Sequence, residues 1–144
     1  MADFNNFDPA QYVLTFGGIL VQGYAADTFI NAARNEDSYS QKVGSQGDVT
    51  RIRSRNKSGI VTVTLMAESP TNDRFSARLV ADEATLSGLP AGALMLKDLN
   101  GNTVAVAANA WLQKFADIEV AQESSNREWV IACAEILPFV GGAA

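Results

Sequence analysis

Histidine is absent from this chain of 144 residues. Without an imidazole there is no Ser-His-Asp or Cys-His catalysis, no histidine zinc site and no usual proton shuttle near neutral pH. The only cysteine, Cys133, cannot form an internal disulfide, and its apolar neighbours predict a buried, inert thiol. The chain also lacks a phosphate-cradling glycine motif and a nucleophile elbow. These absences argue against an enzyme and predict no catalytic residue, no cofactor and no metal site.

Long apolar runs are missing as well. No stretch reaches the roughly 18 apolar residues that a transmembrane helix needs. The first residues, MADFNNFDPAQ, show neither the basic nor the apolar region of a signal peptide. We therefore expect the protein to stay in the compartment where it is made.

Basic residues are outnumbered, with 11 Lys and Arg against 16 Asp and Glu, which gives a formal net charge of −5. An acidic protein is a poor candidate for gripping nucleic-acid phosphates, although it could form a surface past which DNA moves without being held. The length fits a single domain, residues 1–144. With 47% hydrophobic and 19% charged residues, the composition is that of an ordinary globular protein.

The clearest structural signal is a strand that leads directly into a helix. Residues 60–67 are rich in β-branched side chains and alternate between two faces, as a half-buried strand does. Ser69 and Pro70 follow, a pair typical of a helix N-cap and first helical position. The helix is predicted over residues 70–87 and ends at Gly88.

The rest of the chain reads mostly as short strands. Gly17-Gly18 predicts a hairpin between strands 12–16 and 19–22, or else a glycine bulge within one long strand. Asn100-Gly101 predicts a second hairpin. Residues 108–116 could be a helical turn or an irregular strand. Further strands are predicted at 28–33, 49–55, 93–97, 103–107, 118–122 and 127–137. Trp111 and Trp129 lie in apolar runs and are predicted to be in the core.

Together these elements predict a mainly β fold, an antiparallel β-sandwich or open barrel with one flanking helix. Residues 1–11 are predicted to be an N-terminal arm and residues 138–144 a C-terminal tail.

Residues 34–48 interrupt this pattern with two glycines and many small polar side chains. A loop of this length is usually functional or disordered. Tyr39 and Val43 would give it apolar groups with which to dock. It is either a contact loop for a partner subunit or a mobile surface flap.

The strand predicted at 49–55 places Arg51, Arg53 and Arg55 on one face. These guanidinium groups could meet phosphates, or pair with carboxylates of a neighbouring chain. They could also form a solvated face that discourages edge-to-edge aggregation.

A set of short motifs, in order along nearly the whole chain, resembles the tail-tube proteins of contractile-tailed bacteriophages, a family of small phage structural proteins. The motifs are Thr15-Phe16-Gly17-Gly18, Asn35-Glu36-Asp37-Ser38, Gly44 and Gly47, Asn56-Lys57-Ser58-Gly59, Ser69-Pro70 with Asn72-Asp73, Lys97-Asp98-Leu99-Asn100-Gly101, Ala110-Trp111 and Arg127-Glu128-Trp129.

The resemblance implies hexameric rings that stack into a hollow tube, with strands of each subunit joined into one inner barrel. It implies a sheath around the tube, a tape-measure protein inside it before DNA passes, a baseplate, and a place in the virion after assembly in the host cytoplasm. The long loop and the terminal arms would bridge subunits. The interface candidates are Glu36, Asp37, Tyr39, Lys42, Val43, Arg51, Arg53 and Arg55.

Two alternatives stay open at the level of the sequence. The tube could belong to a phage-derived contractile injection particle, which shares the architecture. The chain could instead be a monomeric β-sandwich module that binds sugar or protein. Such a module would show an exposed aromatic cluster and would not assemble as its concentration rises.

Overall fold

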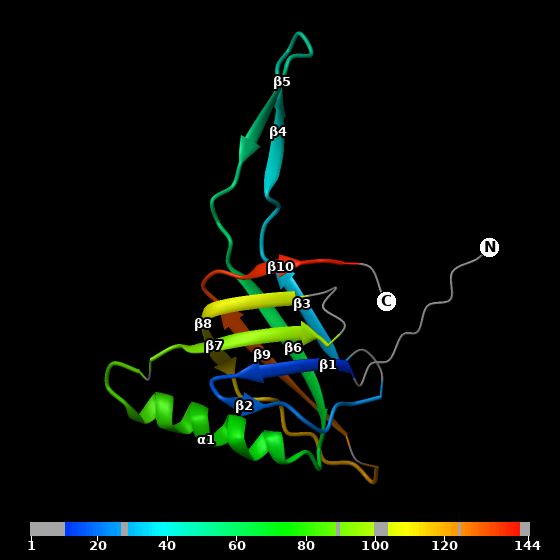
Figure 1. The fold of residues 1–144 in the computed structure, drawn as a ribbon, viewed down its shortest axis with the longest axis vertical. Coiled ribbons are helices and arrows are strands. Elements are labelled where there is room, and N and C mark those ends of the chain that lie inside the picture. Colours follow the sequence, from blue (N-terminus) through cyan, green and yellow to red (C-terminus); the bar gives the residue numbers. More distant parts are fainter. Residues whose placement is uncertain (1–10, 27–28, 89, 100–103, 124, 142–144) are drawn as a thin grey trace, which may run out of the picture.

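The computed structural model describes residues 11–26, 29–88, 90–99, 104–123 and 125–141. Figure 1 shows these as a layered β domain with one helix and one long projecting hairpin. The described elements are β1 (Tyr12–Phe16), β2 (Ile19–Leu20), β3 (Ile30–Arg34), β4 (Tyr39–Val43), β5 (Val49–Arg53), β6 (Gly59–Met66), α1 (Pro70–Ala84), β7 (Gly92–Asp98), β8 (Val104–Lys114), β9 (Asn126–Cys133) and β10 (Leu137–Phe139).

The predicted strand and helix are confirmed as β6 and α1. Val61, Val63 and Leu65 are fully buried, as the alternation predicts. Ser69 caps the helix, because its hydroxyl oxygen accepts a hydrogen bond from the Thr71 amide at 3.2 Å. The helix ends at Ala84, three residues before the predicted end.

The main sheet is antiparallel, and its order is β2-β1-β7-β8-β9-β6-β3. The long strand β8 belongs to two layers, since its first half pairs with β7 and β10 and its second half with β9. In Figure 1 the layer of β1, β7 and β8 crosses over the layer of β3, β6 and β9. The sheet is open rather than closed into a barrel, and the prediction of a mainly β fold with a flanking helix is confirmed.

One core lies between the two layers and is closed at one end by α1. Phe75 of the helix contacts Phe16 and Trp129 edge to face, with ring centroids 6.2 and 5.4 Å apart. The Trp129 Nε1–H donates to the Asn72 side-chain oxygen at 2.9 Å, which joins the helix to β9. The helix therefore covers the open end of the sandwich and fixes its position with a buried aromatic cluster.

The hairpin predicted at Gly17-Gly18 is confirmed. Phe16 pairs with Ile19, and both glycines have positive φ, 57° and 83°, which a tight primed turn requires. The long strand with a bulge is thereby excluded. Residues 108–116, left open between two structures, belong mostly to strand β8.

Several predictions from the sequence are wrong. Residues 39–43, predicted to be loop, form strand β4. Residues 118–122, predicted to be a strand, form none. The last predicted strand, 127–137, is broken by a bend at 134–136, so that β9 and β10 pair with different parts of β8.

Three residues also lie elsewhere than predicted. Trp111 is 42% exposed, because it alternates with the buried residues Ala110 and Leu112 along β8. Pro138 and Phe139 belong to β10 rather than to a C-terminal tail. Residues 1–10 of the arm predicted over 1–11, the turn at Asn100-Gly101 and residues 142–144 of the predicted tail lie outside the described residues.

Candidate assembly interface

Strands β4 and β5 form a two-stranded hairpin that is a sheet of its own. Tyr39 pairs with Arg53 and Val43 with Val49, and the turn beyond them is closed by the Gly44 amide, which donates to the Asp48 carbonyl at 2.7 Å. In Figure 1 the hairpin stands away from the sandwich along the long axis of the molecule. A two-stranded hairpin on its own is only marginally stable in water. We therefore expect another molecule to pack against this one.

One face of the hairpin brings together half of the interface residues predicted from the sequence. Tyr39, Val43, Arg51 and Arg53 share one face, since they occupy paired positions on the two strands. The Arg51 guanidinium lies over the Tyr39 ring, 4.4 Å from its centroid.

The remaining candidates lie apart from that face. Lys42 is on the opposite face of β4, and Arg55 lies beyond the end of β5. Glu36 and Asp37 precede β4, where Glu36 accepts a hydrogen bond from the Ser54 hydroxyl at 3.1 Å. The structure therefore groups four of the eight candidates on one face and leaves four around it.

Both strands of the hairpin are exposed along their whole length, including four large apolar side chains. Tyr39 and Ile52 are 47% exposed, Val43 is 58% exposed and Val49 is 62% exposed. The sequence analysis did not single out Val49 or Ile52. The available signal was their apolar character within the strand predicted at 49–55, but only the structure shows that no described strand covers them.

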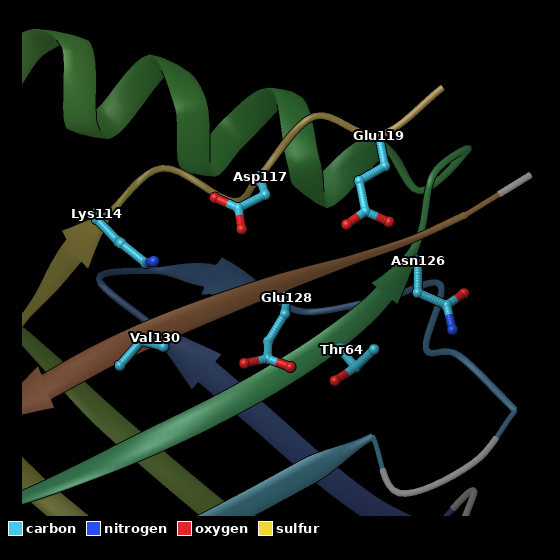
Figure 2. Close-up of a pocket in the computed structure, with 7 residues that line it drawn as sticks. All are labelled: Thr64, Lys114, Asp117, Glu119, Asn126, Glu128 and Val130. Carbon is cyan, nitrogen blue, oxygen red and sulfur yellow. The ribbon is translucent and has the colours of Figure 1, made fainter. Parts of the chain in front are cut away.

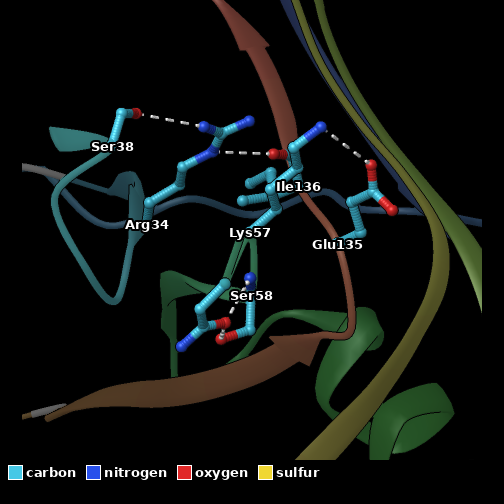
Figure 3. A network of polar contacts seen from close by, with 7 residues as sticks. Arg34, Ser38, Lys57, Ser58, Glu135 and Ile136 are labelled. Carbon is cyan, nitrogen blue, oxygen red and sulfur yellow. Dashed lines mark hydrogen bonds and ion pairs between the residues drawn. The ribbon is translucent and has the colours of Figure 1, made fainter. Parts of the chain in front are cut away.

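The root of the hairpin is held firmly to the sandwich, as Figure 3 shows. The Arg34 side chain donates to the Ile136 carbonyl at 3.1 Å and to the Ser38 hydroxyl at 3.5 Å. Gly59 has no room for a side chain, because a Cβ atom would lie 2.5 Å from the Ala33 carbonyl oxygen. The hairpin therefore projects from a closely packed base that is hydrogen-bonded to the sandwich.

A basic hollow of about 460 Å³ lies beside this base. Its lining includes the cations of Arg53, Arg55 and Lys57 and the carboxylate of Glu135. The Lys57 ammonium and the Glu135 carboxylate form an ion pair, 3.9 Å apart. The arginines of the hollow are thus available to carboxylates of another chain.

A second hollow, of about 370 Å³, lies on the outer face of the β6 and β9 layer (Figure 2). It is lined by Thr64, Lys114, Asp117, Glu119, Asn126, Glu128 and Val130. Three carboxylates and one lysine give it a negative balance, opposite to that of the hairpin. In the part of the chain that the structure describes, no group of three or more acidic, cysteine or histidine side chains could hold a metal ion.

Burial raises the pKa of the Cys133 thiol, in keeping with the buried, inert role predicted for it. Across the described ranges, no helix is long and apolar enough to cross a membrane.

The chain is similar to known phage and injection-system proteins. The sequence profile of the family described as Bacteriophage PhiTE tail tube protein matches residues 7–141. "Structural protein ORF10" of Pseudomonas phage KPP10 is 23% identical over 110 residues, which are 76% of this chain and 64% of that protein. The chain therefore spans less than two thirds of the length of this relative.

Solved structures show the same fold at low sequence identity. The cap that terminates the tube of the anti-feeding prophage has a TM-score of 0.65 at 10% identity, over 100% of this chain and 95% of that one. The sheath/tube terminator of an extracellular contractile injection system, PVC, has a TM-score of 0.66 at 8% identity, over 95% and 99% of the two chains.

A chain from the sheath-tube complex of the PVC system has a TM-score of 0.60 at 9% identity, over 96% of this chain and 93% of that one. With a profile match that covers nearly all of its residues, this chain belongs to the Bacteriophage PhiTE tail tube protein family.

Proposed function

We propose that this tail tube protein assembles with copies of itself into hexameric rings, and that the rings stack into the inner tube of a contractile phage tail. The single observation that best supports this role is the projecting hairpin. It exposes Tyr39, Val43, Val49 and Ile52 on a sheet of its own, where they contribute nothing to the core of the sandwich. Apolar and aromatic side chains of this kind, with arginines beside them, are typical of protein interfaces.

The role is structural rather than catalytic. The fold offers open sheet edges at β3 and β10, each paired on one side only among the described strands. Joining such edges between subunits would remove them and would give a continuous inner barrel.

The tube would be the conduit through which DNA is ejected. The net charge of −5 on each copy supports this role, because a lumen with an acidic lining repels DNA and offers no gain from counterion release. DNA would then slide through without specific binding.

The partners that follow from this proposal are further copies of the chain, a tail sheath around the tube, a tape-measure protein within it and a baseplate at its end. The protein would be made in the host cytoplasm and would end in the virion. A tube of a phage-derived contractile injection particle is the second candidate, favoured by the likeness in fold to parts of the PVC and anti-feeding systems. Capsid genes beside the gene for this chain would favour the phage tail.

The test is negative-stain electron microscopy of the purified, concentrated protein, with and without a tail-tip complex as initiator. We expect hollow tubes or stacked rings, and six-fold averages of the rings. Reversal of Arg51 or Arg53 to Glu should prevent assembly and leave the circular dichroism spectrum of the monomer unchanged. Only small particles with the initiator present would contradict the proposal and favour a monomeric binding module.

A further inference from the structure

The segment that follows β8 carries two large apolar side chains in solvent. Ile118 is 83% exposed and Val120 is 90% exposed. In residues 117–120 they alternate with Asp117 and Glu119, which is the period of a strand. Yet the segment pairs with no strand of the described chain. Its sequence is typical of a strand, but no neighbouring strand pairs with it in the described chain.

Most main-chain N–H and C=O groups of this segment have no hydrogen-bond partner among the described residues. Among the described residues, the main chain of this segment makes one hydrogen bond, in which the Ser125 hydroxyl donates to the Glu119 carbonyl at 2.7 Å. Unpaired main-chain groups next to exposed apolar side chains form a template for the addition of another strand.

The same segment gives the acidic hollow part of its charge. Figure 2 shows the carboxylates of Asp117 and Glu119 turned to the side on which Glu128 lies. Lys114 is the one cation in this lining. A partner strand with positive charge would be favoured here, although the carboxylates by themselves would not define one.

Strand β5 has the complementary pattern. Arg51 and Arg53 alternate with the exposed Ile52, and β5 pairs on one side only, with β4. The Ser54 amide donates to the Ser38 carbonyl at 2.8 Å, which places the even-numbered residues of β5 in the hydrogen-bonded pairs with β4. The main-chain groups of Arg51 and Arg53 therefore point to the open edge.

We propose that residues 117–120 of one copy add as a strand to the open edge of β5 of a second copy. Asp117 and Glu119 then lie beside Arg51 and Arg53, and Ile118 lies beside Ile52, whether the two strands run parallel or antiparallel. The inference rests on the proposed function, since it specifies the contact that the hairpin makes in the tube.

The two surfaces lie far apart within one molecule. In Figure 1 the hairpin is at one end of the long axis, and the chain between β8 and β9 runs near α1 at the other. A hairpin therefore meets this segment on another copy. Because the two surfaces differ, the contact is head to tail and can repeat from ring to ring.

A charge exchange tests the pairing. We expect Arg51→Glu with Arg53→Glu to abolish tubes in electron micrographs and in sedimentation, and Asp117→Arg with Glu119→Arg to do the same. All four changes together should restore tubes, because the opposite charges face one another again. The matched controls are Arg74→Glu and Glu83→Arg on the exposed side of α1, which should assemble as the wild type does.

The alternative acidic partner within the hairpin region is the pair Glu36 and Asp37. Restoration of the Arg51 and Arg53 reversals by Glu36→Arg with Asp37→Arg, and not by the changes at 117 and 119, would overturn the inference. So would normal tubes from either pair of reversals, or failure of the four-fold variant to assemble while its circular dichroism spectrum matches that of the wild type.

A disulfide tests the register independently of charge. Ile52→Cys with Ile118→Cys should give a ladder of multimers on a non-reducing gel after oxidation of assembled tubes. Ile52→Cys with Val80→Cys, an exposed position on α1, should give none, and the native Cys133 is buried. Tubes from the wild type without a ladder from the first variant would overturn this inference alone, whereas a wild type without rings or tubes would overturn the proposed function itself.

Discussion

The sandwich buries most of its large apolar side chains, whereas the hairpin exposes all of its own. In the sandwich Leu14, Phe16 and Phe75 have no exposed surface, and they belong to one continuous core. In the hairpin every residue of β4 and β5 is exposed. The sandwich therefore buries its own apolar surface, whereas the hairpin leaves apolar surface that no other described element covers.

The largest effect should come from the core. Phe75→Ala removes a ring that contacts both Phe16 and Trp129, and should lower the free energy of unfolding by about 3–5 kcal/mol. Urea unfolding of the monomer measures it. Val80→Ala on the exposed side of the same helix is the control, and should change stability by less than about 0.5 kcal/mol. Equal effects at the two positions would contradict the assignment of Phe75 to the core.

A smaller effect should appear at alkaline pH. Burial raises the pKa of Tyr24 to about 12, against a weaker opposing effect of the Leu14 backbone. The pKa in the folded state lies above the unfolded value of about 10. The free energy that this difference contributes to folding is therefore fully present below pH 10. That contribution is lost as the pH rises from about 10 to about 12.

Unfolding midpoints of the wild type and Tyr24→Phe across this range measure the contribution. We expect the wild type to lose stability more steeply than the variant, which has no phenol to ionise. Parallel curves for the two proteins would show that Tyr24 is not protected from ionisation by the fold.

The smallest effect on stability should come from the hairpin. Tyr39→Ala removes a ring that contacts the Arg51 guanidinium and should change the free energy of unfolding of the monomer by less than about 0.5 kcal/mol. The same variant should nevertheless fail to form tubes in electron micrographs. A loss of more than about 1 kcal/mol in the free energy of unfolding would contradict this prediction, because it would show that the hairpin stabilises the sandwich.

The sequence predicted best what local interactions decide. The N-cap at Ser69, the alternation in β6 and the glycines of the first hairpin each act over a few residues, and all three are confirmed. The fold class followed from the number of short strands around one helix.

The errors arose where a partner decides the structure. Strand β4 carries Ser40, Gln41 and Lys42 and has no buried face, so its sequence lacks the apolar alternation of a strand, and it forms by pairing with β5. Residues 118–122 alternate as a strand does but have no neighbour to pair with. Trp111 lies in an apolar run, but the face of β8 on which it lies is not covered by the sandwich.

The interface proposed here could be read from the sequence only in part, for the same reason. Arg51 and Arg53 were singled out from their spacing, whereas Glu119 fell within the strand predicted at 118–122, Asp117 lay just before it, and neither was singled out. Which acidic residues lie near which basic ones depends on how copies meet, and that is not encoded in any one stretch of the chain.

The position of the hairpin gives the molecule a direction. One end of its long axis carries the hairpin and the other carries α1, so the two ends are unlike (Figure 1). In any stack built by head-to-tail contacts, the first and the last ring expose different surfaces. A growing tube would therefore lengthen at one kind of end from a starting platform, and the protein that stops growth would have to recognise a different surface from the one that starts it.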